Sequence, residues 1–192
     1  MLRKLLQLHR NRLRLRLLHR SKRRALIVGA TGHRIGRLRV EGVVDPQLPF
    51  RLRDFAAHVL RDLGATGVVS GMALGWDMAC AHAAIELGLP FDAVAPFPGQ
   101  ESRWPSDVRA EYKWLLDRAE VIDYAGREFS PEIMQRRNEV IVDRSHEMAA
   151  LWDGVKSGGT FNCMIYARDQ GVRVHQCYQH WTQWRGDYVG IK

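Results

Sequence analysis

The segment 153–160, Asp-Gly-Val-Lys-Ser-Gly-Gly-Thr, has the composition of an anion-binding turn. A helix is expected to begin here, and the first amides of a helix have no hydrogen-bond partner within it. These amides and the helix dipole favour a bound phosphate. The order Gly-Lys-Ser/Thr of a P-loop is missing, which argues against ATPase or GTPase chemistry. We predict phosphate contacts from Ser157, Gly158, Gly159 and Thr160; the alternative is a serine N-cap with a flexible glycine turn.

A second glycine-rich turn lies early in the chain, where residues 29–34 read Gly-Ala-Thr-Gly-His-Arg. Its glycines allow the backbone to approach an anion closely, and its histidine and arginine can donate hydrogen bonds. The ligand contacts predicted here are Gly29, Thr31, Gly32, His33 and Arg34. The alternative is a tight turn whose His33 and Arg34 side chains face solvent.

The segment 70–77, Ser-Gly-Met-Ala-Leu-Gly-Trp-Asp, passes from a predicted buried strand into a predicted helix. We predict ligand contacts from Ser70, Gly71 and Asp77. An aspartate in the first turn of a helix repels a phosphate, so Asp77 is expected to bind a sugar hydroxyl or the edge of a base. The alternative is that Asp77 only complements the helix dipole and that Trp76 is a core residue.

The proline-rich loop 96–105 carries a carboxylate and an aromatic side chain beyond the end of another predicted strand. Glu101 is a candidate general acid or base, and Trp104 is a candidate platform for stacking of a nucleobase. The alternative is a rigid surface loop that packs a hydrophobic residue against the next helix.

The stretch that begins at Ser130 has the start signal of a helix, and Arg137 falls on the same face as Ile133 and Ile141. A guanidinium within an apolar stripe needs a carboxylate, a backbone carbonyl or a bound anion, because burying it unpaired costs several kcal/mol. Arg137 is therefore a candidate catalytic or ligand-binding residue, and a structural salt bridge is the equal alternative. Its neighbour Asn138 is a candidate for binding a polar edge of the ligand.

These residues belong to a chain in which short β-rich segments alternate with helix-like segments. This order predicts an α/β fold, a Rossmann-like three-layer sandwich with a mostly parallel sheet of about six strands. The predicted strands are 25–29, 67–70, 91–95, 121–124, 148–152 and 172–176. The predicted helices are 50–63, 76–87, 106–118, 131–145 and 159–170, three of which are stopped by Gly64, Gly88 and Gly171. Ligands bind at the carboxyl ends of such strands, so the turns described above are expected to meet.

Composition limits the class of protein. The 192 residues, 46% of them hydrophobic, suffice for one folded domain. Residues 1–24 contain ten Lys or Arg and no acidic residue, whereas the remainder has 19 basic and 21 acidic residues, a net charge of −2. The three cysteines lack metal-type spacing, so no metal or cofactor is predicted and a cytoplasmic location is expected. No segment has the apolar length of a transmembrane helix.

We predict three parts of the chain: a basic arm over 1–24, expected to be flexible, a nucleotide-binding domain over 25–176 and an aromatic tail over 177–192. The arm has the charge to hold RNA, DNA phosphates or anionic lipid, and the alternative is an unstructured extension. The tail supplies aromatic side chains for stacking on single-stranded nucleic acid, or else covers a sheet edge.

The motifs at residues 29–34, 70–82, 137–145 and 157–167 occur in an order that resembles the SLOG superfamily, above all its YpsA-like branch. The similar segments span about 25–175. The resemblance implies a Rossmann-like sheet that binds a nucleotide or a nucleotide-derived molecule between these motifs.

Two groups within this superfamily imply different functions. In the LOG phosphoribohydrolases, an arginine-bearing helix and a Pro-Gly-Gly motif are similar to Arg137 and to residues 157–159, which implies N-glycosidic hydrolysis with Arg137 as a catalytic residue. The glutamate of their motif is replaced here by Ile165 or Cys163, depending on the alignment. The carboxylate that stabilises an oxocarbenium-like transition state would then have to come from Glu101, Asp77 or Glu139.

The other group is the DNA-processing protein A, which loads recombinase on single strands and has a segment similar to residues 70–77. The function predicted first is binding of a nucleotide or nucleotide-derived small molecule, as a sensor or as an N-glycosidic hydrolase. The alternative is binding of single-stranded nucleic acid through the basic arm and the aromatic tail. The sequence leaves open whether the chain forms a homo-oligomer.

Overall fold

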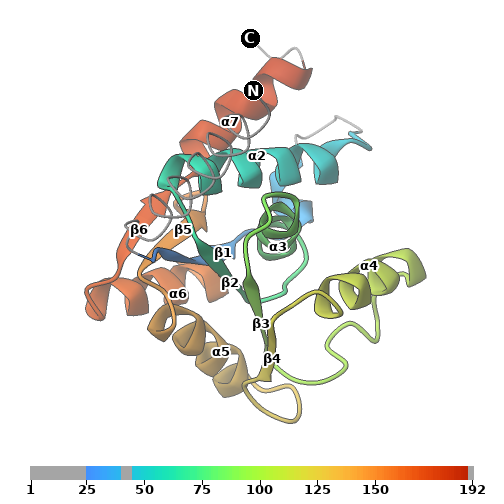
Figure 1. Ribbon diagram of the computed structural model, residues 1–192, viewed down its shortest axis with the longest axis vertical. Helices are drawn as coiled ribbons and strands as arrows, with labels where there is room; N and C mark the ends of the chain where they lie inside the picture. The colour runs from blue at the N-terminus through green and yellow to red at the C-terminus, as the bar shows by residue number, and fades with distance from the viewer. Residues whose placement is uncertain (1–24, 40–44, 190–192) are drawn as a thin grey trace, which may run out of the picture.

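The computed structural model describes residues 25–39 and 45–189, with side chains up to residue 184. The predicted basic arm 1–24 lies outside the described residues. The elements, drawn in Figure 1, are β1 (Ile27–Gly32), η1 (Ile35–Leu38), α2 (Leu48–Leu63), β2 (Gly67–Ser70), α3 (Trp76–Glu86), β3 (Phe91–Ala95), α4 (Ser106–Leu116), β4 (Val121–Tyr124), α5 (Pro131–Asp143), β5 (Glu147–Leu151), α6 (Gly158–Asp169), β6 (Arg173–Gln176) and α7 (Tyr178–Val189).

The six strands form one sheet in the order β4-β3-β2-β1-β5-β6, and every neighbouring pair is parallel. The α/β, Rossmann-like fold predicted from the sequence is confirmed. The strand order reverses at β1, which lies between β2 and β5, and such a switch point opens a crevice at the carboxyl ends of the strands. The turns that follow β1, β2 and β5 therefore meet at this edge.

Helices cover both faces of the sheet, which gives the three layers visible in Figure 1. On one face α2 and α3 bury a large core that includes Phe55 and Trp76. On the other face α5 and α6 bury a smaller cluster around Ile141, Met148 and Cys163. Because both faces are covered, the central strands are nearly continuous apolar runs.

The helix boundaries follow local signals that the sequence carries. Ser130 caps α5, where its Oγ accepts a hydrogen bond from the amide of Ile133 at 3.2 Å. The three predicted stop residues, Gly64, Gly88 and Gly171, have φ angles of +70°, +65° and +71°, in the left-handed region that ends helices. Among the described residues, no helix is both long and apolar enough to cross a membrane.

The segment after β6 is a helix, α7, which the sequence analysis did not predict. Trp181 is fully buried there, and its ring centroid lies 5.4 Å from that of Phe55 on α2. Cys177, Trp181 and Trp184 recur at helical spacing, so the signal was present but was interpreted as a plain aromatic tail. The described part of this tail packs on the core.

Candidate functional site

A cavity of about 290 Å³ opens at the carboxyl edge of the sheet, beside the switch point. Four separate motifs contribute to its wall: the end of β1 with the turn after it, the start of α3, the middle of α5 and the start of α6. The predicted site residues that line it are Thr31, Gly32, His33, Arg34, Asp77, Arg137, Asn138, Ser157, Gly158, Gly159 and Thr160. Segments far apart in the sequence thus meet around one space.

The first turn of α6 presents its amides to this cavity. Ser157 is the N-cap residue, in an extended conformation, and its side chain makes no capping hydrogen bond. Ser157, Gly158 and Gly159 are exposed, and Thr160 is partly exposed. The amides of a first helical turn have no partner within the helix, and the dipole makes this end positive. The start of α6 therefore has the geometry of an anion-binding site.

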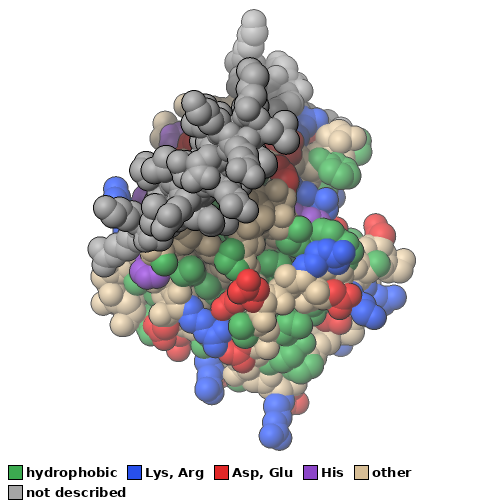
Figure 2. Space-filling view, viewed as in Figure 1, with side chains coloured by type: hydrophobic (Ala, Val, Ile, Leu, Met, Phe, Trp, Pro, Cys, Tyr) green, Lys and Arg blue, Asp and Glu red, His purple; other side chains and the backbone are tan. Residues whose placement is uncertain are grey.

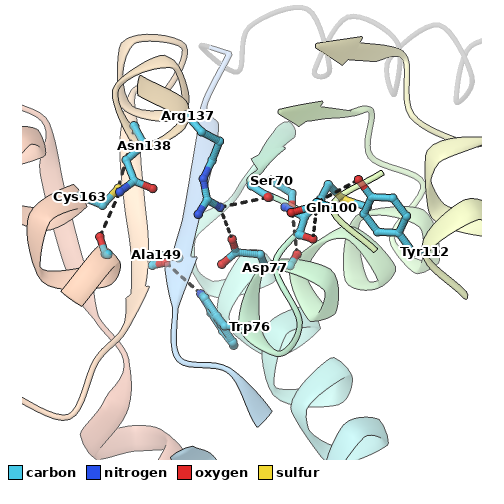
Figure 3. Close-up of polar contacts among 12 residues, drawn as sticks. Ser70, Trp76, Asp77, Gln100, Tyr112, Arg137, Asn138, Ala149 and Cys163 are labelled. Atoms are coloured by element: carbon cyan, nitrogen blue, oxygen red, sulfur yellow. Dashed lines mark hydrogen bonds and ion pairs between the residues drawn. The ribbon is translucent and has the colours of Figure 1, made fainter. Parts of the chain in front are cut away.

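Arg137 projects from α5 into the wall of the same cavity and is only 7% exposed. Its Nη1 donates to the carbonyl oxygen of Gly71 at 3.0 Å and to Oδ2 of Asp77 at 3.1 Å (Figure 3). Its Nε is buried and has no hydrogen-bond partner among the described residues. A buried donor without a partner is costly, so this guanidinium has capacity for one more acceptor.

Asp77 is the carboxylate that balances Arg137. Burial raises the pKa of Asp77 from 3.8 to about 6, although Arg137 and the backbone amide of Ala73 favour the charged form and limit the rise. Asp77 is 3% exposed and lies in the first turn of α3. Arg137 and Asp77 thus form the salt bridge considered from the sequence, and both residues line the cavity.

The backbone around this ion pair is tightly packed, and two glycines make it fit. A Cβ atom at Gly71 would collide with Nη1 of Arg137 and lie 2.7 Å from Oδ2 of Asp77. Gly75 has a φ of +105°, and a Cβ there would lie 2.5 Å from the carbonyl oxygen of His33. These glycines let three motifs approach closely enough for Arg137 to reach Asp77.

The turn after β1 is held by a second polar cluster. Nε2 of His33 accepts a hydrogen bond from the amide nitrogen of Asp153 at 2.9 Å and lies 3.0 Å from Oδ1 of Asp153. Arg37 on η1 pairs with the other carboxylate oxygen of Asp153 at 3.0 Å. These contacts tie the turn after β1 to the turn after β5.

Asn138 connects α5 to the start of α6. Its Nδ2 donates to the carbonyl oxygen of Gly159 at 3.1 Å, and in Figure 3 it points away from Asp77, toward α6. Cys163, one of the two residues aligned with the missing glutamate, is fully buried, and burial raises the pKa of its thiol to about 11. It therefore stays protonated near neutral pH.

Five predicted site residues do not line the cavity. Ser70 and Gly71 lie behind its wall: Oγ of Ser70 donates to the carbonyl oxygen of Asp77 at 2.8 Å, and Gly71 accepts from Arg137. Gly29 lies inside β1, next to Met148, because β1 extends to Gly32 and not to residue 29 as predicted. The longer strand follows from its pairing with β5, which continues to Leu151 opposite Gly32.

Glu101 and Trp104, the other two, are on the loop after β3. The ring of Trp104 packs edge-on against Tyr112, with 5.3 Å between ring centroids, and it contacts the core. Neither residue is in the wall of the cavity. Glu139, the third carboxylate considered, lies in an open hollow between α5 and α6, where it accepts a hydrogen bond from Gln135 at 3.1 Å.

Three lining residues were not predicted: Arg37, Ala73 and Met134. Met134 lies one helical turn before Arg137, and this spacing was a usable signal. Arg37 comes from the 3-10 helix η1, in a loop whose structure the sequence pattern left unassigned. Within the described ranges, no group of three or more His, Cys, Asp or Glu is arranged to hold a metal ion.

The chain belongs to the YspA SLOG family, known as YpsA, whose sequence pattern matches residues 31–180. This confirms the resemblance drawn from the motifs. The chain is also 34% identical over 117 residues to the uncharacterized SPbeta prophage-derived protein YoqJ of Bacillus subtilis (strain 168). That match covers 52% of this chain and 68% of YoqJ.

Two solved structures of DNA processing protein A have a similar fold. The protein from Streptococcus pneumoniae has a TM-score of 0.53 and 18% identity, covering 78% of this chain and 49% of that chain. The protein from Helicobacter pylori, described with a single-stranded DNA binding mode, has a TM-score of 0.50 and 20% identity, covering 78% of this chain and 63% of that one. This chain therefore spans about half to under two thirds of their length, and the likeness shows the fold.

Proposed function

We propose that the chain binds a phosphorylated, nucleotide-derived small molecule in the cavity between α3, α5 and α6. In this proposal the phosphate accepts hydrogen bonds from the amides at the start of α6 and from Arg137. The observation that carries it is that Arg137 lines the same cavity as the start of α6 and has a buried Nε without a partner among the described residues.

The charges around the cavity support an anionic ligand. Asp77 pairs with Arg137, and Asp153 pairs with Arg37. Arg34 also lines the cavity and is exposed, and in the described part of the chain no carboxylate forms an ion pair with it. The guanidinium of Arg34 and the positive end of α6 are thus left to attract a phosphate, which carries about −1.5 to −2 charges at neutral pH.

The remainder of the ligand is proposed to lie toward Asp77, because a carboxylate repels the phosphate but accepts hydrogen bonds from sugar hydroxyls or a base edge. If the protein is an N-glycosidic hydrolase, Asp77 is the carboxylate that acts, since Glu101 and Glu139 are not in the cavity wall. Its role would be to stabilise positive charge on the sugar, with Arg137 holding the phosphate. A sensor would use the same contacts without turnover.

Binding and turnover are tested separately. Titration calorimetry with a panel of nucleoside 5′-monophosphates and inorganic phosphate should give binding that Arg137→Ala removes and Arg136→Ala, at an exposed neighbouring position, retains. Chromatographic detection of free base decides between hydrolase and sensor. Mass spectrometry of small molecules that copurify with the protein identifies the natural ligand. No binding by any of these nucleotides or by phosphate would overturn the proposal.

Nucleic-acid binding is the second candidate, and it draws support only from the shared fold and from the basic composition of residues 1–24. The tail contributes less than its composition suggested, because Trp181 is fully buried against α2 and is not available for stacking on bases. The test is a salt titration of single-stranded DNA binding with and without residues 1–24. Affinity that survives the deletion excludes a role for the arm.

A further inference from the structure

The loop 96–105 follows β3, and none of its residues is in the wall of the cavity. Figure 2 shows side chains of both charges beside hydrophobic ones over the part of the surface where Figure 1 draws α4 and this loop. The visible face of the loop therefore presents no single charge that would attract a ligand of its own. The loop reaches the candidate site from inside the fold, through the half-buried side chain of Gln100.

Gln100 connects two parts of the fold that are distant in the sequence. Its Nε2 donates to the carbonyl oxygen of Met72 at 3.2 Å and to the phenolic oxygen of Tyr112 at 2.9 Å (Figure 3). Tyr112 lies on α4 and is only 2% exposed, and Trp104 of the same loop packs edge-on against its ring. The amide nitrogen of Gln100 thus uses both of its hydrogens, which fixes the direction of the side chain.

Met72 has an unfavourable backbone conformation. Its φ angle is +55°, and in the described part of the chain it is the only residue other than glycine with a positive φ. A long side chain rarely adopts this left-handed region, which persists only where neighbouring contacts hold it. For Met72 these contacts are a fully buried side chain, an amide that donates to Oγ of Ser70 at 3.2 Å and the carbonyl oxygen that accepts from Gln100.

The conformation of Met72 matters because the residue before it binds Arg137. The carbonyl oxygen of Gly71 accepts from Nη1 of Arg137 at 3.0 Å. This carbonyl group and the amide of Met72 belong to one planar peptide unit. A rotation about φ of Met72 turns the whole unit and carries the acceptor oxygen away from the guanidinium. The φ angle of Met72 therefore decides whether Arg137 keeps its present direction.

We propose that Gln100 is a positioning residue for the candidate anion site. By holding Met72 in its left-handed conformation, Gln100 fixes the carbonyl oxygen of Gly71. That oxygen in turn holds the guanidinium of Arg137, while Gln100 itself does not touch the ligand. The inference rests on the proposed function, in which Arg137 donates to the phosphate. It gives the loop 96–105 control over anion affinity without any change in the cavity wall.

The test replaces Gln100 with methionine, which is of similar size but has no amide donor. In the full chain without phosphate, the NMR signal of the Nε proton of Arg137 should shift and exchange faster with water. Titration calorimetry should show an about tenfold higher dissociation constant for inorganic phosphate, because the lost hydrogen bond also restrains a strained residue. Gln135→Met, the same change at a glutamine that lines the open hollow, is the matched control and should change neither readout.

A double variant shows whether Gln100 acts through Arg137. In the Arg137→Ala background, Gln100→Met should cause no further loss of phosphate affinity, as measured by NMR titration. Circular dichroism must show that each variant is folded. If Gln100→Met does not fold, Tyr112→Phe serves in its place, because it removes one acceptor of Gln100 and keeps the ring. It should move the Arg137 signal in the same direction by a smaller amount.

The possible results separate this inference from the proposed function. An unchanged Arg137 signal in a folded Gln100→Met chain overturns the inference, as does an additive loss of affinity in the double variant. If the wild-type chain and Gln100→Met bind phosphate equally well, the inference is wrong and the proposed function stands. If the wild-type chain binds no phosphate, the proposed function is wrong, and the Arg137 signal of the free chain still decides whether Gln100 positions this side chain.

Discussion

Two helices begin at the same edge of the sheet, and their N-termini are occupied in different ways. At the start of α3 the chain satisfies its own polar groups. The amide of Trp76 donates to the carbonyl oxygen of His33 at 3.2 Å, and the carboxylate of Asp77, in the same helical turn, is buried. At the start of α6 the N-cap side chain makes no capping bond, and Ser157 to Gly159 are exposed. Both ends have the same dipole, but only α3 carries its own anion.

Arg137 lies between these two helix starts and shows what the difference means. One of its nitrogens is bound to the α3 side, through Gly71 and Asp77, and its Nε has no partner among the described residues. A helix start with its own carboxylate is a structural element. A helix start without one, beside a guanidinium with an unused donor, is where we propose that an anion from outside binds. The following predictions test this contrast.

Arg137→Ala should have the largest effect. It removes a buried charged donor from the cavity wall, so the dissociation constant for phosphate or a nucleotide should rise about 100-fold, because charge-assisted hydrogen bonds contribute about 1.5–3 kcal/mol each. Titration calorimetry measures this dissociation constant, with Arg136→Ala as the matched control. The variant also leaves Asp77 without its partner, so circular dichroism must confirm that it is folded. An equal loss of affinity in both variants would contradict the assignment of Arg137 as the residue that binds the anion.

Asp77→Asn should act in the opposite direction. It removes the negative charge that neutralises Arg137 while keeping the size of the side chain, so phosphate should bind about tenfold more tightly at pH 7, as expected for loss of a like charge several ångströms away. Asp107→Asn, in the exposed first turn of α4, is the control and should change nothing. Weaker phosphate binding by Asp77→Asn would mean that Asp77 supports the anion indirectly.

The pKa of Asp77, raised to about 6, predicts a pH dependence. As the pH falls from 7 to 5, Asp77 takes up a proton and sulfate, whose charge stays constant in this range, should bind more tightly. The change in sulfate affinity with pH should be much smaller in Asp77→Asn, which has no carboxyl group at this position. An unchanged pH dependence in that variant would show that Asp77 is not the group responsible.

The same shift has a consequence for stability. A carboxyl group whose pKa is higher in the folded state than in the unfolded state stabilises the fold most when it is protonated. The contribution of Asp77 is therefore complete below its ordinary pKa of 3.8 and is lost as the pH rises through about 6. Denaturant unfolding at pH 5 and pH 7 should show a smaller change in unfolding free energy for Asp77→Asn than for the wild-type chain.

Asn138→Ala should have the smallest effect. It removes the hydrogen bond to Gly159 that positions the start of α6, and a neutral hydrogen bond contributes about 1 kcal/mol, so phosphate affinity should fall about fivefold. Gln135→Ala, on the part of α5 that faces the open hollow, is the control. A loss as large as that of Arg137→Ala would mean that Asn138 itself binds the anion.

Most of the sheet could be predicted because buried parallel strands are short apolar runs with clear breaks. The bounds of β2, β3 and β4 agree with the predicted ranges 67–70, 91–95 and 121–124. The first strand was predicted two to three residues too early, since its end is decided by pairing with β5, which no local pattern reveals. Arg137 was recognised because a charged residue on an apolar helical face must have a buried partner.

Loops were the least predictable part of the site. Trp104 has the chemistry of a base-stacking platform, yet the path of its loop packs it against Tyr112. Arg37 enters the wall of the cavity from a loop without periodic signal. Residue type indicates what chemistry a side chain can do, whereas its direction in a loop depends on contacts distant in the sequence.

Phosphate binding at the start of α6 is tested most directly by an amide NMR titration of the full chain with inorganic phosphate. We expect the amides of Gly158, Gly159 and Thr160 to shift together with the Nε proton of Arg137, at one common affinity, while the amides of Trp76 and Asp77 at the start of α3 change little. Shifts confined to α3, or no shift at α6 at phosphate concentrations that shift other parts of the chain, would contradict it.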